Sequence, residues 1–480
     1  MLKKYKIIDL ILLIDVLGIL LTLIFNSTIM SDELEHLRAS FLVSEGYIPY
    51  RDFFEHHHPL LWYIFAPFIY VLPHHAVMIF YTAKIFALIC SCLTYYILYL
   101  LIKKFWGGTK VFLYFTAISL IFYPLWYSVS IFKPDTFARL FYFIGLYFCL
   151  NYIRQRKTGD LVFCGLAFCV AFLFIQTVVF SILPLAVPLI WLFYRDAKFW
   201  KDAALASILP SVFLALIIAV MHYFKALTPY WQENVVFNAH LFGYCYTASA
   251  SVIPFWLIHI GIGIAIACWF MKKQFSVYYG IIFWLFGCEI LQHLYFPAIF
   301  PHYLVIMFML LALLISPAAA QITDRTAYRY IIAFLGVSAI LNLMTLGIKH
   351  NVDYMSAYKA VNTSPENNTL HINFNYVNIY APQQTYYTLV PHHFAWLDNY
   401  LFNRFPEYNV NKLAQISGFT YLDYMPEKNR VPRAAMQERF VLSDDVLQLY
   451  EPVANGLYRR KDLHVGTSLM NYTPKREEHD

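Results

Sequence analysis

The chain has 480 residues, of which 60% are hydrophobic and only 13% are charged. That much apolar surface excludes a soluble globular protein of this size, so we predict a polytopic membrane protein. The formal net charge of +6 does not indicate a nucleic-acid partner, because in a membrane protein the positions of the Lys and Arg residues set the orientation.

Eleven apolar runs come close to the roughly 20 residues that a spanning helix needs. We predict spanning helices at residues 7–25, 76–102, 111–128, 136–153, 161–176, 178–194, 203–224, 252–271, 276–294, 300–318 and 329–348. The aromatic-rich run Pro59–Leu72 is too short to span, and we predict that it forms a helix lying at the membrane interface.

Basic residues gather in alternate connections between the predicted spans. The clusters are Lys3/Lys4/Lys6, Lys103/Lys104/Lys110, Arg154/Arg156/Lys157, Arg195/Lys198/Lys201, Lys272/Lys273 and Arg325/Arg329. The positive-inside rule places this side, with the N-terminus, in the cytoplasm. The opposite side then receives the loop 26–75, the turn at Lys133–Asp135, the turn 297–302 and everything after Lys349.

The composition changes after His350, where polar residues, prolines and aromatic residues are interleaved through Asp480. Residues 370–379 alternate in polarity as a strand does. We predict an all-α transmembrane domain at residues 1–348, with a large first extracytoplasmic loop at 26–75. A small soluble α+β domain at residues 349–480, also extracytoplasmic, has an ordinary domain size.

Asp32 and Glu33 follow shortly after the first predicted span, so their carboxylates lie at the membrane surface. A carboxylate there can act as a general base, taking the proton of an acceptor hydroxyl or amine that attacks an activated sugar carbon. The same acids suit the first turn of a helix, where they complement the helix dipole. Both interpretations stay open.

Further along this loop, carboxylate and imidazole groups are concentrated in a few residues. Three consecutive histidines cannot all point one way, so we name Asp52, Glu55, His56 and His58 as candidate ligands of a divalent cation such as Mg²⁺ or Mn²⁺. The alternative is a solvated run at the membrane interface.

Asp135 is a lone acid in the short turn Lys133-Pro134-Asp135 between two predicted spans. Pro134 and Asp135 both suit a helix start, which is a sufficient structural reason for them. The charge topology adds a functional interpretation, because it places Asp135 on the same side of the membrane as Asp32.

Lys84 and Arg139 fall inside predicted spans. A cation at that depth is costly and usually faces a cavity or an anion, and the phosphate of a lipid suits both residues. Snorkelling to the interface is the alternative. Glu289 and His293 are spaced i, i+4 on one face of a predicted span, with Gln292 beside them.

Several motifs together resemble the GT-C superfamily of membrane glycosyltransferases, above all the bacterial relatives of the protein O-mannosyltransferases and of the lipid A aminoarabinose transferase. They are Asp32-Glu33, Gly46, Pro49 to His56, His58-Pro59-Leu60, Lys133-Pro134-Asp135 and Pro301-His302-Tyr303.

This resemblance implies an inverting transfer of a sugar from a polyprenyl-phosphate carrier to an acceptor, on the extracytoplasmic face of the bacterial inner membrane. By the resemblance, Asp32 is the catalytic acid with Glu33 adjacent, and Asp135 takes the second acidic position. Lys84 stands where relatives commonly carry Arg, and His302-Tyr303 lies close to the carrier lipid. A Lys in place of Arg keeps the charge but loses the bidentate fork.

The chemistry of a lipid phosphate donor favours the same function, because such a donor needs cations near the membrane interface and a carboxylate beside its sugar. The acceptor is an envelope glycan, a lipid or a protein. The alternative function is a transporter or flippase of a lipid-linked sugar. We find neither repeated halves nor a pair of Gly/Pro-broken spans, which are typical of transporters.

Overall fold

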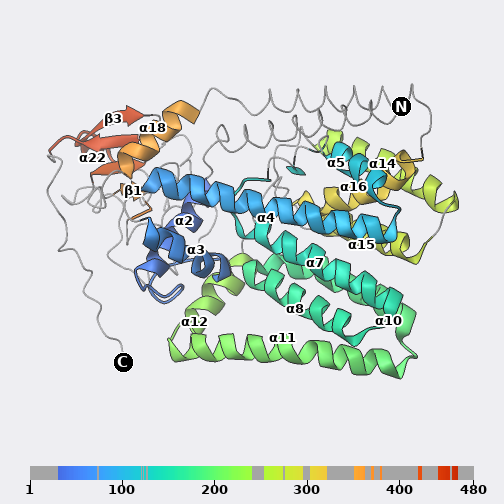
Figure 1. Ribbon diagram of the computed structural model, residues 1–480. Helices are drawn as coiled ribbons and strands as arrows, with labels where there is room; N and C mark the ends of the chain where they lie inside the picture. The colour runs from blue at the N-terminus through green and yellow to red at the C-terminus, as the bar shows by residue number, and fades with distance from the viewer. Residues whose placement is uncertain are drawn as a thin grey trace. The chain divides into compact units, whose positions relative to one another are not determined.

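The computed structural model (Figure 1) describes the parts of the chain that follow. They are residues 31–72, 75–119, 122, 124–125, 128–239, 253–273, 276–295, 303–321, 351–362, 369–371, 379–380, 420–423, 442–454 and 457–462. The spans predicted at 7–25 and 329–348 lie outside the described residues, as does His302.

The chain divides into two compact units. The first consists of residues 1–27, 56–61 and 81–348, and the second of residues 28–55, 62–80 and 349–480. The predicted boundary between residues 348 and 349 stays a prediction, because residues 322–350 are outside the described part of the chain.

The chain is a multi-pass membrane protein built mainly from apolar helices. Within the described residues, five helical stretches are long and apolar enough to cross a membrane: Ala76–Phe105, Pro134–Gln155, Gln176–Phe193, Ala197–Tyr223 and Val277–Leu294. The longer helices described in the first unit, with α4 shared between the units, are α4 (Ala76–Phe105), α5 (Thr109–Ser119), α7 (Pro134–Gln155), α8 (Thr158–Phe174), α11 (Ala197–Tyr223), α14 (Ile253–Lys273), α15 (Val277–Tyr295) and α16 (Val305–Ala319). Each of these helices overlaps a predicted span.

The break predicted at Gln176 is present. Helix α8 ends at Phe174, and Ile175 is extended. The chain then continues through four short pieces, η1 (Gln176–Val178), α9 (Val179–Ile182), η2 (Leu183–Leu185) and α10 (Ala186–Phe193). Pro184 stands at the start of η2, where its missing N–H is tolerated.

Helices α7, α8 and α11 pack side by side (Figure 1), and glycines allow their close approach. A Cβ atom at Gly145 of α7 would lie 2.4 Å from the ring of Phe168 on α8. A Cβ atom at Gly165 of α8 would lie 2.8 Å from the backbone oxygen of Ala206 on α11. Small residues at such crossings are typical of packed membrane helices.

Helix α11 has a largely exposed, apolar surface. Trp200 near its start and Tyr223 at its end are both exposed. Amphipathic aromatic residues favour the two membrane–water interfaces, so the exposed side of α11 is suited to lipid. By contrast, α16 is buried along most of its length.

The second unit combines loop helices with the small strand-containing C-terminal region. Its elements are α2 (Ser31–Ser44), most of α3 (Leu60–Val71), α18 (Asn351–Val361), β1 (Thr369–His371), β2 (Tyr421–Asp423), α22 (Asp444–Leu447), β3 (Tyr450–Ala454) and β4 (Leu457–Arg460). The sheet has the order β1-β2-β4-β3, with β1 parallel to β2 and the other pairs antiparallel. The predicted fold class, a helical membrane bundle with a small α+β region, is confirmed.

The core of the second unit joins residues that are distant in the sequence. The Trp62 ring is fully buried, and its Nε1–H donates to Nδ1 of His36 at 3.2 Å. The Tyr358 hydroxyl donates to the backbone oxygen of Ala76 at 3.1 Å, and its ring lies beside Phe80. The C-terminal region therefore shares its core with segments that precede and open α4.

Candidate active site

A cavity in the first unit gathers polar side chains from α7, from the pieces that follow α8, from α15 and from the residues just before α16. Its polar lining is Asp135, Arg139, Thr177, Ser181, Glu289, Gln292, His293 and Tyr303. The cavity volume is ≈ 70 Å³. This is several times the ~10–15 Å³ that one water molecule needs, so the cavity admits a polar group larger than water.

Asp135 enters the cavity from the first turn of α7. Lys133 is the extended N-cap residue (φ −135°, ψ 152°) and Pro134 is the first helical residue. The Thr136 hydroxyl donates to the backbone oxygen of Ile131 at 2.9 Å, which closes the turn. The structural interpretation of the Lys-Pro-Asp motif therefore holds, and the turn also presents the Asp135 side chain to the cavity.

Arg139 lies one turn further along α7, and only 5% of it is exposed. Its guanidinium donates to the Thr136 hydroxyl (2.9 Å) and to the backbone oxygen atoms of Ser128 (3.3 Å) and Asp135 (3.4 Å). None of these acceptors is charged, and no ion pair of the guanidinium occurs among the described residues, although the Asp135 carboxylate on the same helix interacts with it electrostatically. A buried cation whose charge is only partly balanced is costly, so this position favours an anionic ligand.

Helix α15 contributes a polar face to the cavity. Glu289 is buried, and its Oε2 lies 3.7 Å from Nε2 of His293, beyond hydrogen-bond distance. The buried atoms Gln292 Oε1 and His293 Nε2 have no hydrogen-bond partner among the described residues. The i, i+4 spacing of Glu289 and His293 had indicated a shared helix face, and the structure turns that face toward Asp135 and Arg139.

Of the other predicted donor-site residues, Tyr303 also lines this cavity. Lys84 is buried in α4, with 1% of it exposed, but it is not among the lining residues. His302 lies outside the described residues. The structure therefore brings together Asp135, Arg139 and Tyr303 from the predicted set.

Asp32 and Glu33 both occupy the first turn of α2, as the helix-start interpretation requires. Their burial differs, because Glu33 is fully buried whereas Asp32 is partly exposed. They belong to the second unit and the cavity belongs to the first. Their role as base therefore stays a prediction.

The predicted metal ligands are divided between the two units, and two of them are poor ligands. Both oxygens of Asp52 are engaged, since it accepts the Ile48 N–H at 2.8 Å and pairs with Arg51 at 2.8 Å. The Nδ1–H of His58 donates to the backbone oxygen of Phe172 at 2.5 Å, and its Nε2 lies 2.9 Å from the Tyr230 hydroxyl. Both ring nitrogens of His58 are thus used.

Glu55 and His56 are both buried, and their assignment as metal ligands stays a prediction. The residues present do not fit the full set of four, so no step of the proposed reaction below is assigned to a metal ion.

Polar residues that the sequence did not single out fix the backbone at His56. Its carbonyl oxygen accepts a hydrogen bond from Asn238 Nδ2 at 2.7 Å and another from Gln176 Nε2 at 3.1 Å. Asn238 follows α12 (Leu227–Tyr230) and a π-helical segment, η3 (Trp231–Val236). A sequence signal was present, since Asn234 and Asn238 are spaced i, i+4, but it did not reveal the partner.

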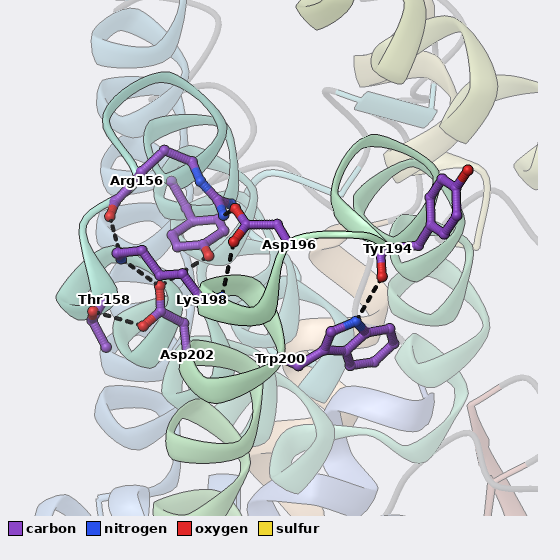
Figure 2. Close-up of polar contacts among 8 residues, drawn as sticks. Arg156, Thr158, Tyr194, Asp196, Lys198, Trp200 and Asp202 are labelled. Atoms are coloured by element: carbon purple, nitrogen blue, oxygen red, sulfur yellow. Dashed lines mark hydrogen bonds and ion pairs between the residues drawn. The ribbon is translucent and has the colours of Figure 1, made fainter.

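At the other end of α7, an ionic network ties α7 to α8 and α11 (Figure 2). The buried Asp202 carboxylate accepts hydrogen bonds from Lys198 (2.7 Å), Thr158 (2.8 Å) and the Tyr152 hydroxyl (3.0 Å). Beside it, Arg156 pairs with Asp196 and lies over the Tyr152 ring.

The cavity and this network mark the two ends of one spanning helix. Helix α7 has 22 residues, which at 1.5 Å per residue is about 33 Å, close to the thickness of a bilayer hydrocarbon core. The cavity residues therefore lie toward one membrane face, and the cluster of basic residues around Arg156 lies toward the other.

Comparisons with known proteins agree with this architecture. Residues 56–214 match the family model described as dolichyl-phosphate-mannose-protein mannosyltransferase. The structure resembles that of ArnT from Cupriavidus metallidurans bound to undecaprenyl phosphate, with a TM-score of 0.64 and 13% sequence identity over 94% of this chain and 97% of that chain.

The structure of ArnT from Cupriavidus metallidurans in the apo state has a TM-score of 0.49 and 16% identity, over 75% of this chain and 66% of that chain. No curated protein shows significant sequence similarity to this chain. The matched family model and the shared fold confirm the resemblance predicted from the sequence motifs, which is to the GT-C superfamily of membrane glycosyltransferases.

Proposed function

We propose that this chain is a glycosyltransferase that moves a sugar from a polyprenyl-phosphate carrier to an acceptor at the extracytoplasmic face of the bacterial inner membrane. The mannosyltransferase family model and the fold shared with an undecaprenyl-phosphate-bound protein support the enzyme class and the donor class. The acceptor is an envelope glycan, a lipid or a protein.

The observation that carries the proposal is the buried guanidinium of Arg139 beside Asp135, in a cavity formed by membrane helices. A polyprenyl-phosphate donor joins an anionic head to a long apolar chain. Its phosphate would add to the negative charge that Asp135 brings to Arg139, and the bilayer accommodates the apolar chain. A cation at this place also stabilises the charge that develops on the leaving phosphate.

The charge distribution supports the proposed orientation. Basic residues follow the C-terminal end of α7 at Arg154, Arg156 and Lys157, and the positive-inside rule assigns that end to the cytoplasm. The cavity at the N-terminal end of α7 then opens toward the extracytoplasmic side, where the C-terminal region is also predicted to lie.

In the proposed reaction, an oxygen or nitrogen of the acceptor attacks the anomeric carbon and its proton passes to Asp32. The bond from that carbon to the phosphate oxygen breaks, the electron pair stays on the phosphate, and the configuration inverts. Asp32 is a better candidate for the base than Glu33 because it is partly exposed, whereas Glu33 is fully buried. We assign Asp135 as the second catalytic acid, Lys84 and Arg139 to the donor phosphate, and His302 and Tyr303 to the carrier lipid.

The test is the transfer of radiolabelled sugar from polyprenyl-phosphate donors to envelope acceptors in proteoliposomes that contain the full chain. We expect Asp32→Asn to reduce transfer about 100-fold or more, in the range of general-base catalysis. The matched control is Asp445→Asn, which also removes an acid from the first turn of a helix, α22, and should leave transfer unchanged.

Undiminished transfer by Asp32→Asn would contradict the base assignment. The alternative function makes a different prediction for the same vesicles, because a flippase would move the lipid-linked sugar across the bilayer without transferring it.

A further inference from the structure

We propose that the polar face of α15, formed by Glu289, Gln292 and His293, recognises the sugar of the donor and selects a sugar without an acidic group. The inference rests on the proposed function and deepens it, because it assigns the sugar and the phosphate of one donor to different helices.

The first observation is that the polar face of α15 costs free energy in a membrane helix. Glu289, Gln292 and His293 lie near the end of a helix that is otherwise apolar along its span. An ionisable or strongly polar side chain within a membrane helix is expensive and usually marks a ligand path or a binding site. All three side chains line the same cavity, so they share one potential ligand.

The second observation is that this face has unused hydrogen-bonding capacity. Gln292 Oε1 accepts hydrogen bonds only, and His293 Nε2 accepts or donates one according to its tautomer. Both atoms are buried without a partner among the described residues. Buried polar atoms are nearly always paired, so these two atoms favour a ligand with hydroxyl groups that donate to them.

The charges of the lining residues further limit which ligands fit the cavity. Asp135 and Glu289 bring two carboxyl groups to the cavity, and Arg139 brings one guanidinium. The Arg139 side chain comes from α7 and is the natural partner of the phosphate. What remains for the sugar is an acceptor-rich wall on α15, which attracts hydroxyl or amino groups and repels a carboxylate.

The size of the cavity sets how much of the sugar it receives. A volume of ≈ 70 Å³ is less than half of the ~150 Å³ of a cavity that binds benzene. The cavity therefore takes one hydroxyl-bearing edge of the sugar ring. Recognition of an edge by buried polar atoms gives strong discrimination, because a ligand that lacks the matching group leaves those atoms unpaired.

The test compares the binding of four probes to the full chain purified in detergent. They are bare undecaprenyl phosphate and the same carrier bearing glucose, mannose or galacturonate. In the wild type, we expect at least one neutral-sugar carrier to bind at least 10-fold more tightly than the galacturonate carrier and more tightly than the bare carrier.

Glu289→Gln and Gln292→Ala should each weaken the binding of the preferred neutral-sugar carrier about 10-fold. Each should leave the affinity for bare undecaprenyl phosphate within 2-fold of the wild type. The retained affinity for the bare carrier also shows that the variant is folded. Leu291→Ala, an exposed position on the same helix, is the matched control and should change neither affinity. Glu289→Asp, which keeps the carboxylate, should retain part of the preference.

Two outcomes would overturn the inference while leaving the proposed function intact. In one, no sugar-bearing carrier binds the wild type more tightly than bare undecaprenyl phosphate. In the other, Glu289→Gln and Gln292→Ala weaken the binding of the sugar-bearing carrier and of bare undecaprenyl phosphate equally. If the wild type binds no polyprenyl phosphate at all, the proposed function itself fails, and the inference fails with it.

Discussion

His58 is held as a neutral imidazole between Phe172 and Tyr230. Burial lowers the pKa of His58 to about 4, and the neighbouring His57 adds to that effect. At neutral pH the ring therefore carries one proton. That proton is on Nδ1, because the backbone oxygen of Phe172 can only accept, and Nε2 then accepts from the Tyr230 hydroxyl.

This arrangement predicts an acid-sensitive stability. The unfolded chain binds a proton at His58 near pH 6.5 and the folded chain only near pH 4. The stability that the folded chain gains from a neutral His58 is therefore complete above pH 6.5. It is lost as the pH falls toward 4, by roughly 3 kcal/mol in total. Thermal unfolding in detergent should show a steeper loss of stability between pH 7 and pH 4.5 for the wild type than for His58→Asn.

Asn is the matched substitution because its side-chain amide keeps a donor for the Phe172 oxygen and does not titrate. Parallel pH profiles for the two proteins would assign the acid sensitivity to other groups.

The sequence identified part of the cavity from local rules. Asp135 was identified as a candidate site residue because Lys-Pro-Asp starts a helix at a turn between two spans. Arg139 was identified because a cation within a spanning helix needs an anionic partner. The contacts of Gln176 and Asn238 with the His56 carbonyl could not be found in this way. They join residues more than 100 positions apart, and nothing in the local pattern encodes such a pairing.

At the scale of the elements, the close approach of α8 and α11 depends on Gly165. A Cβ atom there would lie 2.8 Å from a backbone oxygen, which cannot rotate away as a side chain can. We expect Gly165→Ala to destabilise the folded state by about 1–3 kcal/mol through overpacking.

Gly159, on the same helix, is the matched control. An added Cβ atom there meets no atom of the described residues within 4 Å, so Gly159→Ala should stay within about 0.5 kcal/mol of the wild type or stabilise it. Denaturant titration of both variants in the same detergent checks the pair. An equal loss for both would show that the packing distance at Gly165 does not limit stability.

Apolar run length and periodicity predicted the positions of the long helices, such as α7 and α11, because burial in lipid demands a minimum apolar length. The short pieces η1, η2 and η3 were not predicted. They differ from an α-helix only in which carbonyl each N–H reaches, and the same apolar residues suit either pattern.

At the scale of the whole molecule, the proposed orientation places residues after Lys349 outside the cytoplasm. A periplasm-dependent reporter such as alkaline phosphatase, fused after Asp480 in a bacterial host, should therefore be active. The same reporter fused after Lys157 should be inactive, because the basic cluster that follows α7 is assigned to the cytoplasm. The reverse pattern of activities would exclude a cavity that opens on the extracytoplasmic side.

The segment η3 has a consequence for the tolerance of the chain to length changes. In η3 the Phe237 N–H reaches the carbonyl of Gln232, five residues back, so the helix there accommodates one residue more than an α-helical turn. Deleting a single residue from η3 would restore the α-helical pattern and leave Asn238 near its present face, because the wide turn already absorbs the extra residue. Deleting a residue from α12 with η3 kept would instead turn Asn238 by about 100° about the helix axis, away from the His56 carbonyl. The backbone of the histidine-rich loop therefore tolerates the loss of a residue at η3 and not in the turn before it.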